Sequence, residues 1–296
     1  ERTKQYYALF SLFVFTMLLA CLSNNIILTW AAVEATTLST VFLVGIYKNK
    51  QALEASWKYA MVCTAGVAFG LFGTLLIYAN AADIMPNAHE AAFLTSIMPY
   101  ADQFDPMLVR LAFAFIVIGF GTKAFIFPFH PLAADAHAVA PASISLMISG
   151  VLTKCGVYGI IRLVYALFQN IQVPAVQYLV VGFGTISMFV CVTMAFNQHN
   201  FKRLLAFHSI SQVGYVITAL GLGTALGLSS GLFHAMNHTL FKGLLFLTAG
   251  AVQHATGSLD LDKLGGLAKK MPRTCILFLI GAASISGLPP FNGFAS

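Results

Sequence analysis

Apolar residues are grouped along the chain into nine long stretches that are separated by short polar breaks. A helix needs about 20 mostly apolar residues to cross the roughly 30 Å hydrocarbon core of a membrane. The pattern therefore predicts an all-α, polytopic bundle of transmembrane helices. We expect these helices at about 6–22, 26–46, 58–79, 107–127, 142–167, 175–196, 204–221, 225–250 and 274–296. The long connection Asn80–Pro106 is acidic.

The composition excludes an ordinary soluble domain. Hydrophobic residues make up 58% of the 296 residues and charged residues only 9%, against roughly 25% charged residues in soluble domains. The mean hydropathy is +0.82, so lipid is the expected solvent. The net charge is +6, but no basic stripe with interleaved aromatic residues points to nucleic acid. No signal peptide is recognised, and the chain ends inside an apolar stretch, so we expect a fragment.

The distribution of basic residues predicts the orientation of the chain in the membrane. With nine helices, one set of helix ends and loops holds eleven Lys and Arg residues, and the loops on the other side hold none. Cytoplasmic loops carry the excess of basic residues. We therefore expect the N-terminal end on the cytoplasmic side of a prokaryotic cytoplasmic membrane. The eleven residues are Arg2, Lys4, Lys48, Lys50, Lys58, Lys202, Arg203, Lys263, Lys269, Lys270 and Arg273.

Two of the predicted helices contain proline-rich breaks, at Pro128 and Pro131 and at Pro289 and Pro290. Proline removes a backbone donor and clashes with the preceding turn. Carbonyl groups freed at membrane depth must then be satisfied by protein or by water in a cavity. Paired broken helices are typical of transporters that are built from inverted repeats. The alternative is that both breaks are simple helix ends at the membrane interface.

Four ionisable residues lie inside apolar helices: Glu34, Lys123, Lys154 and Lys242. Each charge near the bilayer centre costs about 2.5–3.5 kcal/mol, so four would cost roughly 10–14 kcal/mol. Burial favours the neutral form of a lysine, and a neighbouring carboxylate favours its charged form. A movable Glu–Lys pair can therefore switch a lysine between holding and releasing a proton. The alternative, static ion pairs between helices, leaves three lysines against one acid.

His234, His238 and Lys242 follow one another at intervals of four residues and therefore share one helix face. Imidazole exchanges protons near neutral pH, so this stripe is interpreted as a proton relay. Two histidines one turn apart can also chelate a metal, which keeps a membrane metalloenzyme as an alternative. The remaining histidines and the five cysteines are scattered. The sequence therefore predicts no metal site and no iron–sulfur site.

Several motifs resemble those of the antiporter-like membrane subunits shared by respiratory complex I, Mrp-type sodium/proton antiporters and energy-converting hydrogenases. The chain looks most similar to the membrane subunits of formate hydrogenlyase and related nickel–iron hydrogenases. The matching stretches are Trp30-Ala-Ala-Val-Glu34, Gly121-Thr-Lys123, Phe127-Pro-Phe-His130, Asp135-Ala-His137, Ser149-Gly-Val-Leu-Thr-Lys154, Lys202-Arg203-Leu-Leu-Ala-Phe-His208-Ser209 and His234-Ala-Met-Asn-His238-Thr-Leu-Phe-Lys242.

The resemblance implies a single antiporter-like domain over 1–296, with a first inverted repeat at about 1–167 and an incomplete second repeat at about 175–296. It assigns Glu34 as the switching acid, Lys123 as the first proton carrier and Lys154 as the link to the second half. His234, His238 and Lys242 would continue this axis. Accessory roles are expected for Trp30, His130, Asp135, His137 and His208.

The resemblance also implies what lies outside this chain. The chain carries no flavin, iron–sulfur or quinone motif, so nickel–iron and iron–sulfur centres are expected in partner subunits. Those partners would be other membrane subunits and a peripheral redox arm. Protons are the expected cargo, and a sodium/proton antiporter of the Mrp type is the alternative. The segment His130–His137 departs from the family pattern His-x-Trp-Leu-Pro-Asp-Ala-His, and the family's exit Lys or Glu is expected beyond Ser296.

Overall fold

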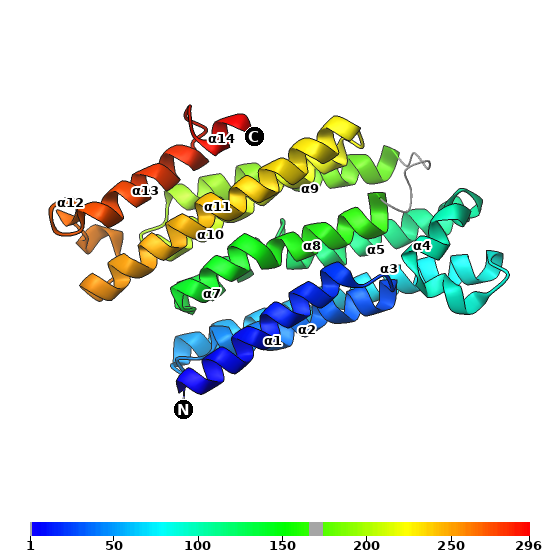
Figure 1. Ribbon diagram of the computed structural model, residues 1–296, viewed down its shortest axis with the longest axis horizontal. Coiled ribbons are helices and arrows are strands. Elements are labelled where there is room, and N and C mark those ends of the chain that lie inside the picture. The colour runs from blue at the N-terminus through cyan, green and yellow to red at the C-terminus, as the bar shows by residue number, and fades with distance from the viewer. Residues whose placement is uncertain (1, 166–173) are drawn as a thin grey trace.

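The computed structural model describes residues 2–165 and 174–296, and within these ranges it contains helices and no strand. Nine long helical segments lie side by side, and each reverses the direction of the one before it (Figure 1). They are α1 (Arg2–Leu22), α2 (Ile26–Val44), α3 (Lys50–Ile84), α5 (Pro106–Lys123), Ala142–Tyr165, α9 (Pro174–Phe196), α10 (Phe201–Gly221), α11 (Ala225–Thr256) and α13 (Pro272–Ile285).

The predicted transmembrane bundle is confirmed, with differences at the helix ends. Seven of the described helical segments are long and apolar enough to cross a membrane. The 32-residue α11 carries the polar stripe, and α13 has only 14 residues. Helix α3 begins at Lys50 and not near residue 58, because the side chain of Asn49 caps its first turn and Glu54 pairs with Lys58 one turn later.

The connections contain short helices that the hydropathy pattern does not predict. The acidic connection holds η1 (Ala88–Ala92), α4 (Leu94–Ile97) and η2 (Met98–Gln103), and the last one holds η5 (Leu261–Lys263) and α12 (Leu267–Lys270). Each connection returns to the start of an earlier helix. An antiparallel bridge joins Phe93 to Asn25, which caps α2, and another joins Asp260 to Asn200, which caps α10. The two halves of the chain thus repeat one pattern of connections.

The two broken helices share one local geometry. Phe125 lies between α5 and α6 (His130–Val139) with a φ of 56°, and Gly287 lies between α13 and α14 (Asn292–Ala295) with a φ of 68°. A positive φ is uncommon for a bulky residue such as Phe125. The amide of Ile126 donates to Gly121 O at 3.2 Å, and 162 positions later that of Leu288 donates to Ala283 O at 3.1 Å. Both freed carbonyls are thereby satisfied inside the protein.

The predicted breaks differ in detail. Pro128 lies between the two parts of the first broken helix, whereas Pro131 lies in the first turn of α6, where a missing amide proton costs nothing. Pro289 and Pro290 both lie between α13 and α14. Because nine helices alternate in direction, the segment from α9 onward runs opposite to the one from α1 onward (Figure 1). The arrangement supports the expected inverted repeats.

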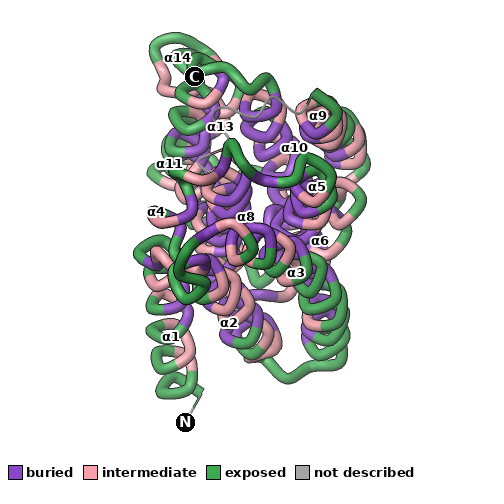
Figure 2. The backbone as a smooth tube through the Cα atoms, turned by 90° about the vertical axis from the view of Figure 1, so that its right-hand side faces the viewer, coloured by how far each residue is buried: buried purple, intermediate pink, exposed green. Residues whose placement is uncertain are grey.

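Close helix packing sets the position of the first break. Helices α3 and α5 cross at Gly70 and Gly119, where a Cβ on Gly119 would lie 2.3 Å from the amide nitrogen of Gly70. Small residues allow such close approach of helix backbones in a membrane. Helix α8 (Thr153–Ile160) then packs on the end of α5, because Gly156 leaves room for the backbone of Lys123. Buried residues gather in the middle of the bundle, and exposed residues cover its outer faces (Figure 2).

Candidate functional site

Lys123 is the last residue of α5 and has no exposed surface. Its ammonium group donates a hydrogen bond to Oγ1 of Thr36 on α2 at 3.1 Å and lies 5.7 Å from the ring centre of Tyr59 on α3. The ion pairs found among the described residues do not include Lys123. A hydroxyl and an aromatic face therefore hold the lysine, and no fixed counter-charge locks its proton.

Glu34 lies in the middle of α2 and is half-buried, whereas the sequence suggested full burial. Its carboxylate accepts hydrogen bonds from Thr37 at 3.0 Å and from Thr64 at 2.8 Å. Thr64 is exposed, so the carboxylate points to the outer face of α2 and α3. The expected Glu34–Lys123 ion pair is absent from the described part of the chain in this conformation, because threonine hydroxyls bind both groups.

Lys154 lies at the start of α8, directly after the π-helical turn η3 (Ile148–Leu152). Its ammonium group donates to the carbonyl oxygen of Ser149 at 2.8 Å and contacts Nδ1 of His238 on α11. His238 is fully buried, and its Nε2 has no hydrogen-bond partner among the described residues. A lysine and an imidazole in direct contact can share one proton, so only one of the two needs to carry charge at a time.

Lys242 lies one turn after His238 and is also fully buried. Its ammonium group donates to the carbonyl oxygen of Leu205 at 3.0 Å, and this oxygen also accepts from the hydroxyl of Ser209 at 2.8 Å. The hydroxyl of Ser149 donates to that of Ser209, again at 2.8 Å. These hydrogen bonds connect Lys242 through Leu205 O and Ser209 to the hydroxyl of Ser149, whose backbone carbonyl accepts from Lys154. We call Lys123, Lys154, His238 and Lys242 the central polar row.

His234 is half-buried at the edge of this row, one turn before His238. Its Nε2 hydrogen-bonds to Oε1 of Gln212 at 2.9 Å, and its Nδ1 to Oγ of Ser296 at 3.1 Å. It lines a cavity of about 320 Å³ between α10, α11 and α13 together with Tyr215, whose ring centre lies 6.0 Å from that of His234. The members of the predicted stripe share one helix but bind different partners.

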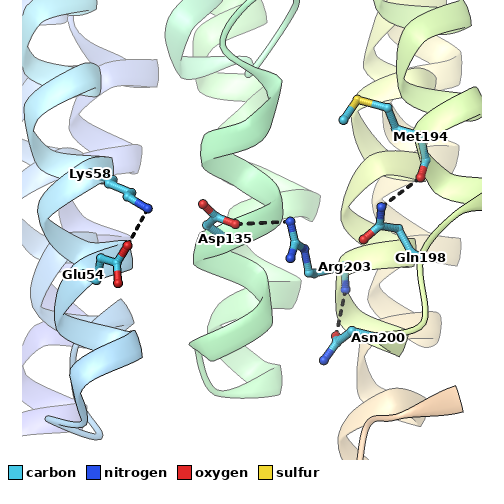
Figure 3. A network of polar contacts seen from close by, with 7 residues as sticks. All are labelled: Glu54, Lys58, Asp135, Met194, Gln198, Asn200 and Arg203. Carbon is cyan, nitrogen blue, oxygen red and sulfur yellow. Dashed lines mark hydrogen bonds and ion pairs between the residues drawn. The ribbon is translucent and has the colours of Figure 1, made fainter. Parts of the chain in front are cut away.

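Asp135 lies away from the central polar row. Its carboxylate is half-buried on α6 and forms an ion pair with Arg203 of α10 at 3.4 Å, as Figure 3 shows. Glu54 and Lys58 form a second pair at 2.6 Å on the neighbouring α3, and all four residues line a polar cleft of about 330 Å³. Exposed ion pairs of this kind contribute only about 0–1 kcal/mol to stability. The structure thus places Asp135 at the end of the bundle.

The two histidines of α6 are almost completely buried. His130 stacks on Phe127 with ring centres 5.5 Å apart, and His137 stacks on Phe246 at 4.9 Å. The Nδ1 atom of each has no hydrogen-bond partner within the described ranges. Buried polar atoms of this kind are usually satisfied by ordered water. The accessory role of both histidines stays a prediction.

The remaining accessory candidates lie on α2 and α10. Trp30 is half-buried and donates its indole N–H to the carbonyl oxygen of Val67 at 2.8 Å, which ties α2 to α3 four residues before Glu34. His208 is half-buried on α10. Trp30 therefore acts on the geometry of the helix pair. Within the described ranges no hydrogen bond joins His208 to the central polar row.

Sequence reasoning missed the hydroxyl groups that connect the ionisable residues. Thr36, Thr64, Ser149 and Ser209 all bind a charged group or another hydroxyl of the site. The ring of Tyr59 also lies against the ammonium group of Lys123. A signal was present, because hydroxyl residues lie within five positions of Glu34 and of Lys154 on otherwise apolar helices. Buried hydroxyl groups are nearly always hydrogen-bonded, so these residues were expected to have hydrogen-bond partners.

A metal centre finds no support in the geometry. Among the described residues, no group of three His, Cys, Asp or Glu side chains comes together in a way that could hold a metal ion. His234 and His238 bind Gln212 and Lys154 respectively and do not converge. The chelating interpretation of the two histidines therefore lacks a third ligand in the described part of the chain.

Comparison with known proteins places this geometry in a family. A Hydrogenase-4 component F homolog of Methylacidiphilum infernorum (isolate V4) is 36% identical over 291 residues, which are 98% of this chain and 61% of that protein. A chain of the membrane-bound sulfane sulfur reductase, an archaeal respiratory membrane complex, matches with a TM-score of 0.88 at 30% identity and covers 97% of this chain and 57% of that one.

A chain of the Mrp complex from Dietzia sp. DQ12-45-1b matches with a TM-score of 0.85 at 26% identity and covers 97% of this chain and 52% of that one. The chain thus spans between half and two thirds of the length of these relatives. Residues 23–296 match the family model described as NADH:quinone oxidoreductase/Mrp antiporter, TM. The expected family is confirmed: this chain is a multi-pass membrane protein that belongs to the NADH:quinone oxidoreductase/Mrp antiporter membrane-subunit family.

Proposed function

We propose that this chain translocates protons across a prokaryotic cytoplasmic membrane as the antiporter-like subunit of a redox-driven complex. The complex would be a membrane-bound hydrogenase or an enzyme of the NADH:quinone oxidoreductase type. The direct contact between Lys154 and buried His238 carries the proposal. No carboxylate pairs with Lys154 among the described residues, so the contact is stable when the pair holds one shared proton.

The central polar row supplies the steps that such a transfer requires. Lys123 lies at the helix break, and α8 packs directly on its backbone at Gly156, two residues after Lys154. From Lys154, a proton can pass to His238 through the side-chain contact. The carbonyl oxygens of Ser149 and Leu205 hold the ammonium groups of Lys154 and Lys242 in place, and the hydroxyls of Ser149 and Ser209 link the two backbones. Each buried charge in this row costs about 2.5–3.5 kcal/mol. When the groups share few protons, fewer of them are charged at one time, and the total cost of burial is lower.

The outer position of Glu34 supports the expected membrane partners. A carboxylate at mid-helix that faces lipid is costly, because its charge loses water without gaining a counter-ion. A neighbouring membrane subunit that covers the face of α2 and α3 would remove Glu34 from lipid. We propose further that a peripheral arm holds the nickel–iron and iron–sulfur centres, in line with the hydrogenase component name of one relative. The N-terminal end and the basic loops would face the cytoplasm.

The central experiment replaces Glu34 in the full-length protein within its complex. We expect Glu34→Gln to assemble normally, because glutamine keeps an oxygen that accepts the hydrogen bond from Thr64. Proton translocation in sealed vesicles should be lost, since an amide does not titrate. Glu54→Gln is the matched control, because Glu54 is an exposed acid on the adjacent α3. Unchanged proton translocation by Glu34→Gln would contradict the assignment of Glu34 as the switching acid.

An Mrp-type sodium/proton antiporter is the second candidate, because the matched chain of an Mrp complex has nearly the same fold. Both candidates use the same buried lysines, so variants of this chain do not distinguish the two functions. Purification of the intact complex distinguishes them. Subunits that contain nickel and iron–sulfur clusters would support the redox-driven complex. Purification without any redox subunit, together with sodium-dependent proton exchange, would support the antiporter.

A further inference from the structure

An apolar groove of about 300 Å³ lies at the end of the bundle, apart from the central polar row. It is formed where the start of α10 and the end of α11 meet the 257–271 connection and the start of α13. The hydrophobic lining includes Phe201, Leu204, Val252, Leu264, Leu267 and Phe278. A groove of this size is large enough for an extended apolar chain of about ten carbon atoms, at roughly 30 Å³ for a group the size of water.

The structure holds the wall of this groove in place. The amide of Phe201 donates to the carbonyl oxygen of Leu259 at 2.9 Å, and that of Leu261 donates to His199 O at 2.8 Å. His199 also contacts the carboxylate of Asp262 at 2.7 Å. These contacts clamp the connection onto the turn before α10. The groove is therefore a built feature of the fold and does not depend on a loose loop.

Three basic residues lie next in sequence to residues that line the groove. Lys269 and Lys270 are exposed on α12, and Arg273 is exposed at the start of α13. They alternate along the chain with the groove-lining residues Ala268 and Met271. The ion pairs within the described ranges include none of the three. An apolar groove whose lining segment also carries three exposed cations without an ion pair thus matches a molecule with an apolar tail and an anionic head.

We propose that this groove binds one anionic phospholipid, with an acyl chain against Phe201 and Phe278 and the phosphate near Lys269, Lys270 and Arg273. Basic clusters beside a membrane surface attract anionic headgroups. A zwitterionic lipid carries a cation in its own headgroup, so these three basic residues attract it less strongly. An apolar protein segment would fill the groove but would leave the three cations unneutralised. The charge of these residues therefore favours the lipid over a protein segment as the occupant.

The test measures lipid retained by the full-length protein. The protein is equilibrated in mixed phosphatidylglycerol and phosphatidylcholine and its bound lipids are counted by native mass spectrometry. We expect preferential retention of phosphatidylglycerol, lowered about fivefold or more in K269Q/K270Q/R273Q. The variant K4Q/K48Q/K50Q is the matched control, because it removes three exposed charges from the same end of the bundle, on the side of α1 (Figure 1). T274W should also lower retention, by filling the groove without changing its charge.

A second measurement uses the unchanged groove. Cys275 lines it and is half-buried. In a background that lacks the other four cysteines, we expect phosphatidylglycerol, but not phosphatidylcholine, to slow the reaction of Cys275 with a membrane-permeant maleimide. Equal retention in the groove variant and the control, or equal protection by both lipids, would overturn the proposal. So would a full-length protein that retains no phospholipid, because the groove would then be covered by protein. Neither readout depends on proton transport.

Discussion

The ammonium group of Lys154 meets Nδ1 of His238, although 84 positions separate the two residues in the sequence. Lys154 lies in the last helical segment of the first half and His238 in the third helix of the second half. Thr239, the next residue, donates its hydroxyl proton to Gly150 O at 2.7 Å and fixes the register of the two helices. The contact therefore joins the two halves at a group that can exchange a proton.

Replacing His238 tests this junction. In His238→Gln the amide oxygen can still accept a hydrogen bond from Lys154, but the side chain cannot carry a proton. We expect normal assembly and proton translocation reduced at least tenfold, because a positioned acid–base group contributes about 10²–10⁴-fold. His254→Gln is the matched control, since His254 is exposed near the end of the same helix. A near-normal rate in His238→Gln would remove the histidine from the pathway.

The close crossing of α3 and α5 should tolerate no side chain. A methyl group at Gly119 would lie 2.3 Å from the amide nitrogen of Gly70, so Gly119→Ala must push the helices apart. Overpacking of this kind costs about 1–3 kcal/mol. We expect a lower thermal unfolding temperature of the purified protein. Gly182→Ala is the control, because no atom lies within 4 Å of the added carbon. Equal unfolding temperatures in the two variants would show that the crossing can relax.

The positions of the helices could be predicted because apolar stretches long enough for a membrane allow few other structures. The start of α3 could not, because an i,i+4 pair such as Glu54–Lys58 makes a helical turn look like a polar loop in a hydropathy pattern. For the same reason, the hydropathy pattern did not predict the short helices in the connections.

The site was predictable to the level of its ionisable residues, because the cost of a buried charge singles out a lysine in an apolar helix. Their partners were not. The contacts of Lys123 with Thr36 and of Lys154 with His238 depend on how distant helices pack, and no spacing within one helix reveals them. The exposure of Glu34 was misjudged for the same reason.

The orientation of the chain is testable at the 257–271 connection. Gly265 is exposed and no atom lies within 4 Å of an added Cβ, so Gly265→Cys should not disturb the fold. In a background without the native cysteines, we expect no reaction with an impermeant maleimide from outside intact cells. Ala88→Cys, in the connection at the opposite end, should react (Figure 1). Labelling of Gly265→Cys from outside would reverse the orientation inferred from the basic residues.

Lys123 offers the sharpest distinction between a proton carrier and a fixed charge. Arginine keeps the positive charge but does not release its proton at working pH, because its pKa exceeds about 12. A lysine that is needed only as a charge should therefore tolerate replacement by arginine. A lysine that carries protons should not. Lys123→Arg can keep both the hydrogen bond to Thr36 and the contact with the ring of Tyr59.

We expect Lys123→Arg to assemble normally and to lose at least nine tenths of its proton translocation in sealed vesicles, in line with the loss of an acid–base group. Lys123→Ala should also lose translocation, but it should not lose expression, because Thr37 and Thr64 satisfy the carboxylate of Glu34 without the lysine. Lys58→Arg, at an exposed lysine of α3, is the control for the substitution itself. A static role predicts the opposite order, with near-normal translocation for Lys123→Arg and poor expression for Lys123→Ala.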